Sequence, residues 1–115
     1  MQYFDAEQGE ELKLAFEDLV LDWPSVAAKT MFGCPSYRAD DTIFAVLVTD
    51  GVVLTRLPSD ERTQLEQLFD TAPFEASGRT VEDWVTVPVD GGSALGALRP
   101  YLEASYETAL AEVSD

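Results

Sequence analysis

The chain has 115 residues, 46% of them hydrophobic, and this length suits a single domain over residues 1–115 that needs no disulfide or metal to fold. Its 22 acidic residues outnumber 7 Lys and Arg and give a net charge of −15, which disfavours direct nucleic-acid binding because phosphate contacts need clustered cations. The absence of histidine excludes Ser-His-Asp and Cys-His catalysis.

The acidic residues are spread along the chain, whereas the only lysines are Lys13 and Lys29. Such a charge repels itself in dilute buffer and is screened in molar salt, where the Debye length is about 3 Å. We therefore expect a halophilic protein, with an ordinary acidic protein at moderate salt as the alternative. The N-terminus lacks the cationic start of a secretory signal, and no apolar run reaches the roughly 18 residues of a membrane span. We expect a cytoplasmic location and no membrane contact.

The first predicted element is an amphipathic helix over residues 5–23. Apolar residues recur at helical spacing from Leu12 to Trp23, and acidic residues fall between them. Pro24 disfavours helical geometry at the residue before it and ends the helix. We expect residues 25–30 to form a connection or a short helical turn.

Three strands follow in a predicted antiparallel meander. They cover residues 31–39, 42–49 and 52–58, joined by turns at Asp40-Asp41 and Asp50-Gly51. Gly33 and Pro35 interrupt the first strand. The second strand is apolar on both faces, which is typical of a central strand covered on each side.

The second half of the chain is predicted to contain a helix, a further strand and a C-terminal helix. The predicted features are a helix over residues 59–69 with Ser59 as N-cap, a turn at Ser77-Gly78, a strand over residues 84–89 that Pro88 limits, and a loop at Asp90-Gly91-Gly92. Pro100 disrupts a regular helix, so we expect residues 93–98 to form a separate turn and Pro100 to stand near the first position of the last helix.

Together these elements predict an α+β fold. A helix, an antiparallel three-strand meander, a helix, one or more further strands and a C-terminal helix pack on one mostly antiparallel sheet. The aromatic residues expected in its core are Phe32, Tyr37, Phe44, Phe74, Trp84, Tyr101 and Tyr106.

Three segments resemble the TfoX N-terminal-domain family: "KTMFGCPSYRADDTIFAVLVTDGVVLTRLP", "PFEASGRTVEDWVTVP" and "LRPYLEASYE". Family members share an MFG segment, an FA strand, an LP-terminated strand, a WV-VP segment and an LRPWLE-SY helix. The counterparts here are Met31-Phe32-Gly33, Phe44-Ala45, Leu54 to Pro58, Trp84-Val85 with Val87-Pro88, and Leu98 to Tyr106. Cys34-Pro35 matches a subgroup of the family. Thr80-Val81 and Asp41-Thr42 depart from its usual residues.

What the resemblance implies is a fold more than an activity. The founding members are regulators of natural competence with a second, C-terminal domain, and that role is not carried over to this chain. The family offers no catalytic motif to transfer.

Cys34, the only cysteine, stands between Gly33 and Pro35. A reactive thiol needs a His, a cation or a helix N-terminus to lower its pKa, and the neighbouring sequence holds no dedicated activator. We interpret Cys34 as a small, half-buried residue at a turn. Tyr37 and Arg38 project from the strand that follows. Cys34, Tyr37 and Arg38 are the candidate ligand-facing residues.

No catalytic residue, metal site or cofactor is predicted. One cysteine and no histidine argue strongly against a structural zinc site. Asp40, Asp41 and Asp50 lack the spacing of a calcium-binding loop, and turn chemistry explains them. The glycines match neither phosphate-binding fingerprint.

These observations predict a non-enzymatic binding or regulatory module that acts through an unknown protein partner or as a homo-oligomer. Two alternatives stay open. One is a small-ligand binder or minor enzyme that uses the Cys34 turn region. The other is a transcription-related regulator, which rests on the family resemblance alone.

Overall fold

The computed structural model describes residues 4–5, 7–31, 33–49, 51–76, 79–89 and 95–113. The elements run in the order α1 (Glu10–Val20), β1 (Val26–Met31), β2 (Cys34–Ala39), β3 (Thr42–Val48), β4 (Gly51–Leu54), α2 (Ser59–Leu68), β5 (Ala72–Ala76), β6 (Arg79–Pro88) and α3 (Leu95–Val113). None of the helices in these residues combines the length and the apolar character needed to cross a bilayer.

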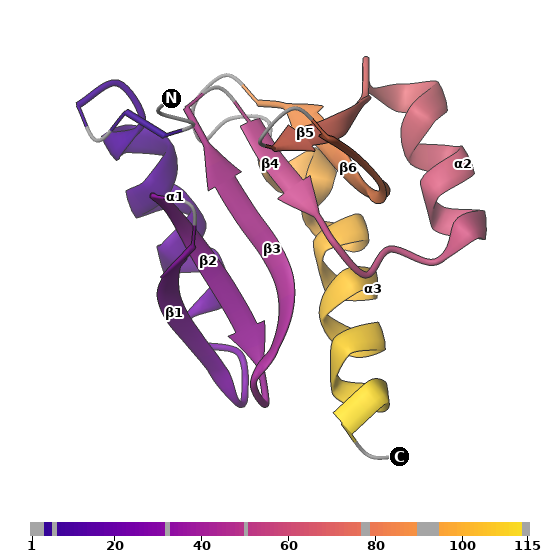
Figure 1. The fold of residues 1–115 in the computed structure, drawn as a ribbon. Helices are drawn as coiled ribbons and strands as arrows, with labels where there is room; N and C mark the ends of the chain where they lie inside the picture. The colour runs from indigo at the N-terminus through magenta and orange to yellow at the C-terminus, as the bar shows by residue number, and fades with distance from the viewer. Residues whose placement is uncertain are drawn as a thin grey trace.

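The six strands form one sheet in the order β1-β2-β3-β4-β6-β5, and every neighbouring pair is antiparallel. Figure 1 shows α1 beside the β1–β2 end of the sheet, α2 beyond the opposite end, and α3 along β3. The α+β fold and its mainly antiparallel sheet are therefore confirmed. The sheet has more strands than the sequence predicted.

The prediction that residues 25–30 form a connection is wrong, because Val26–Met31 is a strand. The single strand expected over residues 31–39 is the end of β1 followed by β2, and the two pair from Val26↔Ala39 to Met31↔Cys34. Gly33, at φ 76°, lies in the tight turn between them, where a side chain would be strained. The predicted interruption at Gly33 is thus a hairpin turn.

The next turn in the chain is a two-residue hairpin at Asp40 and Asp41. Their φ values are 49° and 70°, and the flanking pair is Ala39↔Thr42. Positive φ at both central residues matches the right-handed twist of the strands, and Asp tolerates that region better than most residues. This turn agrees with the prediction, whereas Asp50 of the following predicted turn lies outside the described residues.

Helix α1 begins at Glu10, five residues later than predicted, because the preceding residues form a separate turn. The Asp5 carboxylate accepts the N–H groups of Glu7 and Gln8 at 2.9 and 3.2 Å. Gly9 is the N-cap, and a Cβ there would lie 2.5 Å from the ring of Phe4. The helix ends at Val20, before Pro24 is reached.

Strand β5 was not predicted, and β6 is longer than the expected strand over residues 84–89. The two strands pair antiparallel, and β6 ends at Pro88 as expected. The turn at Ser77-Gly78 and the loop at Asp90-Gly91-Gly92 lie outside the described residues. Ser59 is the first residue of α2 and not its N-cap, which is Pro58 without a side-chain hydrogen bond.

The prediction of a break before Pro100 is wrong, because Pro100 lies inside α3. The leucines on both sides of it, Leu98 and Leu102, are fully buried on one helical stripe. Proline removes one N–H donor near the helix start. Burial of a continuous apolar stripe outweighs that loss.

Helix α3 is fixed to the sheet by hydrogen bonds and aromatic packing. The buried Ser105 hydroxyl donates to the Phe44 carbonyl at 2.7 Å and accepts the Arg56 N–H at 3.1 Å. The Tyr106 hydroxyl donates to the Pro24 carbonyl at 2.6 Å. The centroid of its ring lies 5.0 Å from that of Trp23 and 5.5 Å from that of Phe44. These ring contacts connect α3 to β3 and to the segment that follows α1.

The core contains most of the aromatic residues that the sequence assigned to it. Tyr37, Phe44, Phe74, Tyr101 and Tyr106 are buried. Trp84 is half-buried, and Phe32 lies outside the described residues. The core prediction is thus confirmed for the five buried residues.

We predict that Ser105→Ala lowers the free energy of unfolding by about 1–3 kcal/mol, because the Arg56 N–H loses its acceptor in a buried place. Denaturant unfolding followed by circular dichroism measures the change. Thr108→Ala is the matched control, since the Thr108 hydroxyl bonds to the Ala104 carbonyl of its own helix, and the free energy of unfolding should change by no more than about 0.5 kcal/mol. Equal effects of both substitutions would contradict the assigned role.

Candidate functional site

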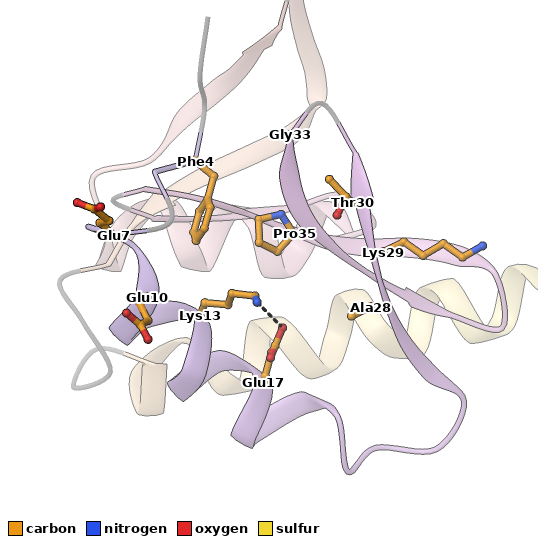
Figure 2. A pocket seen from close by; sticks show the side chains of 10 residues that line it. All are labelled: Phe4, Glu7, Glu10, Lys13, Glu17, Ala28, Lys29, Thr30, Gly33 and Pro35. Atoms are coloured by element: carbon orange, nitrogen blue, oxygen red, sulfur yellow. Dashed lines mark ion pairs between the residues drawn. The ribbon is translucent and has the colours of Figure 1, made fainter.

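A cavity of about 610 Å³ lies between α1 and the hairpin formed by β1 and β2. We call it the α1–β1 groove. It is lined by Phe4, Glu7, Glu10, Lys13, Glu17, Ala28, Lys29, Thr30, Gly33 and Pro35, as Figure 2 shows. Its volume falls in the range of small-molecule pockets and also suits several residues of a peptide.

One wall of the groove is the polar face of α1. The spacing of Glu10, Lys13 and Glu17 places them on one side of the helix. Lys13 Nζ lies 3.9 Å from Glu17 Oε2, and the Tyr37 hydroxyl donates to the same oxygen at 2.8 Å. The Glu17 carboxylate is therefore held by one partner from its own helix and one from β2.

The other wall is the β1–β2 hairpin, whose side chains alternate between the two faces of the sheet. The paired residues Ala28↔Tyr37 and Thr30↔Pro35 face α1, because Tyr37 reaches Glu17 from that side. The paired residues Ala27↔Arg38, Lys29↔Ser36 and Met31↔Cys34 lie on the opposite face. Lys29 contributes to the rim of the groove, and its ammonium group points away from Lys13 in Figure 2.

The hairpin differs in charge from the rest of the chain. Residues 23–39 contain no Asp or Glu and carry two positive charges, Lys29 and Arg38. This is the longest stretch of the sequence without an acidic residue. Because β1 is also the first strand in the sheet order, an acid-free segment forms one edge of a strongly acidic protein.

The structure does not place Cys34, Tyr37 and Arg38 on one surface. Cys34 and Tyr37 are fully buried, with Tyr37 packed 4.8 Å from Phe16 between ring centroids. Arg38 is half-buried and lies, by the β1–β2 register, on the face opposite to Tyr37. A binding role for these three residues stays a prediction.

Burial affects the two ionisable groups among these residues in the same direction. It raises the pKa of the Cys34 thiol above its ordinary value. It also raises the pKa of Tyr37, and the hydrogen bond and negative charge of Glu17 raise it further. Both groups are therefore neutral at neutral pH, and a neutral thiol is a poor nucleophile.

The sequence predicts a connection over residues 25–30 and therefore does not indicate the strand that lines the α1–β1 groove. The four central residues of β1 are all exposed, so the segment lacks the alternation that distinguishes a half-buried strand from a loop. The available signal was charge, since the acid-free stretch ends abruptly at Asp22 and Asp40. The groove also depends on Phe4 and Lys13, which are distant from the hairpin in sequence.

The described side chains offer binding groups rather than a metal site. No group of three or more Cys, Asp or Glu residues in the described ranges is arranged to hold an ion. Asp40 and Asp41 are accounted for by their turn. In the groove, the ammonium group of Lys13 is paired with Glu17.

Comparison with protein families gives one result that covers most of the chain. Residues 18–109 match the family model of the TfoX N-terminal domain. The chain belongs to the TfoX N-terminal domain family. Comparisons with curated proteins and with solved structures gave no match.

In this TfoX N-terminal domain, the segment "LRPYLEASYE" has an architectural role. Leu98 and Leu102 are buried, Ser105 bonds to β3 and Tyr106 to Pro24. The MFG segment contributes Gly33 to the turn between β1 and β2. These residues contribute to the fold, and of them only Gly33 also lines the described groove.

We predict that Cys34 reacts slowly with a thiol reagent such as dithiobis(nitrobenzoate) at neutral pH, because its side chain is fully buried and its pKa is raised. The same protein unfolded in guanidinium chloride is the control and should react at the rate of an ordinary thiol. Rapid reaction of the folded protein would contradict the prediction and favour a functional thiol.

Proposed function

We propose that this TfoX N-terminal domain is a non-enzymatic binding module with a regulatory role, acting through contacts with another protein. The observation that supports the proposal is the exposed, acid-free edge strand β1. An edge strand with reachable backbone groups is a recurrent site of protein association. Because the chain carries a net charge of −15, an acidic partner would be repelled from most of its other surfaces.

A second candidate function is supported by the volume of the α1–β1 groove. About 610 Å³ lined by Phe4, Pro35 and polar side chains suits a small molecule. The polar wall of α1 offers carboxylates and one ammonium group, so the ligand would carry both apolar and polar parts. A transcription-related role rests on family analogy alone and has no support from the groove.

We predict that the purified protein forms a stoichiometric complex with a partner from its own cell. The tagged protein is used for capture, and the captured protein is then identified and reconstituted from pure components. Light scattering after size exclusion in molar KCl gives the mass of the complex, with the tag alone as the control. A strict monomer that retrieves no reconstitutable partner would contradict the proposed function.

The distribution of charge also supports a cytoplasm of high salt as the setting of this domain. We expect the melting temperature to rise from low to molar KCl, because salt screens the repulsion among acidic side chains. Circular dichroism follows the transition. A variant with the exposed residues Asp22 and Asp70 changed to Asn should show a smaller rise. Melting that is independent of salt would argue against a halophilic protein.

A further inference from the structure

Resting on the proposed protein-contact function, we infer that β1 binds an extended acidic segment of a partner protein, which adds to the sheet as a further strand. The partner segment alternates acidic residues with small uncharged ones. The acidic side chains lie on the face of Lys29 and Arg38, and the small side chains enter the α1–β1 groove. This specifies the site and the chemistry of the partner.

The backbone of β1 provides the first argument. The Asp40 N–H donates to the Ser25 carbonyl at 3.1 Å, and the Ser36 hydroxyl donates to the Lys29 carbonyl at 2.9 Å. Hydrogen-bonded pairs alternate along an antiparallel ladder, so Ala27, Lys29 and Met31 direct their polar groups to β2. Ala28 and Thr30 direct theirs to the other side, where no further strand lies within the described residues.

Exposure provides the second argument. The four central residues of β1, from Ala27 to Thr30, are all exposed, whereas all four residues of β4 are buried. The other edge strand, β5, contains Pro73, which has no N–H to donate. An incoming strand therefore reaches backbone groups more completely on β1 than on β5.

The charged side chains of the β1–β2 hairpin indicate the chemistry of the partner segment that binds β1. In the register of the hairpin, Lys29 opposes Ser36 and Arg38 opposes Ala27, so the two cations are diagonal neighbours on one face. Side chains of an added strand alternate between the two faces. Those on the cationic face lie beside Lys29, with Arg38 of β2 one strand further in, and both positive charges complement carboxylates.

The opposite face of the added strand meets different neighbours. Ala28 and Thr30 are small, and Glu10 and Glu17 of α1 line the same groove. Carboxylates there would be repelled by these glutamates. Uncharged side chains avoid this repulsion, and short ones match the small residues Ala28 and Thr30 that they would face.

A second copy of this chain fits the edge less well than an acidic segment. Pairing of β1 with β1 of another copy would bring Lys29 and Arg38 of both copies to one junction without a carboxylate between them. Lysine on an edge strand is also a common device against pairing of identical edges. The charge pattern therefore favours a different, acidic partner.

The test uses the hexapeptide acetyl-Val-Glu-Val-Glu-Val-Glu-amide as the probe, added to the full chain labelled with nitrogen-15. We expect saturable shifts of the backbone amide signals of Ala28, Lys29 and Thr30 in nuclear magnetic resonance spectra. The peptide with Lys in place of Glu, and the acidic peptide with N-methylated Val residues, should produce none. The first control tests charge, and the second tests backbone pairing.

Variants of the protein separate the two contributions. Lys29→Gln should weaken binding about three- to tenfold, because a charge-assisted contact is lost. Arg99→Gln is its matched control, since Arg99 is exposed on α3 and its loss changes the net charge equally. Ala28→Pro should abolish binding and keep the fold, because the Ala28 N–H faces away from β2.

Several results would overturn the inference. They are the absence of amide shifts in β1, equal shifts with the Lys peptide, undiminished binding to Ala28→Pro, or dimerisation of the free protein through β1. Binding of the captured partner to the Ala28→Pro variant shows whether the inference about β1 or the proposed function has failed. If the partner binds Ala28→Pro as well as the original chain, only the inference about β1 is wrong, whereas no partner at all contradicts the proposed function.

Discussion

The carbonyl oxygen of Phe44 is the point at which the sheet and α3 are joined. It accepts the Thr55 N–H at 3.2 Å and the Ser105 hydroxyl at 2.7 Å. The same hydroxyl accepts the N–H of Arg56, just after β4 ends. Because these bonds are directional and Ser105 is fully buried, they determine the position of α3 along β3.

This joint leaves the two ends of the sheet with different support. The centre is packed against α3, which also contacts β2, whereas α1 meets the β1–β2 hairpin through side chains of β2. The contacts of the hairpin with α1 are the Phe16–Tyr37 ring pair and the hydrogen bond from Tyr37 to Glu17. Where α1 departs from the hairpin beyond these contacts, the α1–β1 groove opens. The groove is thus a consequence of how the first helix is attached.

The sequence predicted the features that depend on strong local signals. The apolar run of β3, the Asp40-Asp41 turn and the stripe of α1 all have such signals, and the family segments located the rest of the scaffold. Strand β1 was not predicted because it is exposed on both faces and lacks the alternation of apolar and polar residues that is typical of a half-buried strand. The helix across Pro100 depends on the burial of Leu98 and Leu102, which a local rule cannot include. The groove could not be predicted, since it joins Phe4 and Lys13 to a hairpin whose existence was not foreseen.

The acid-free hairpin has a consequence for the kinetics of association. An anionic partner that approaches at random meets a molecule of charge −15 and is repelled at long range, and it is attracted only close to Lys29 and Arg38. Salt screens the distant repulsion more effectively than the contact between neighbouring charges. Moderate salt therefore accelerates encounter with such a partner, which is the reverse of the usual salt effect on oppositely charged proteins. In a salt-rich cell, the dissolved ions would weaken the long-range repulsion and allow an anionic partner to reach β1.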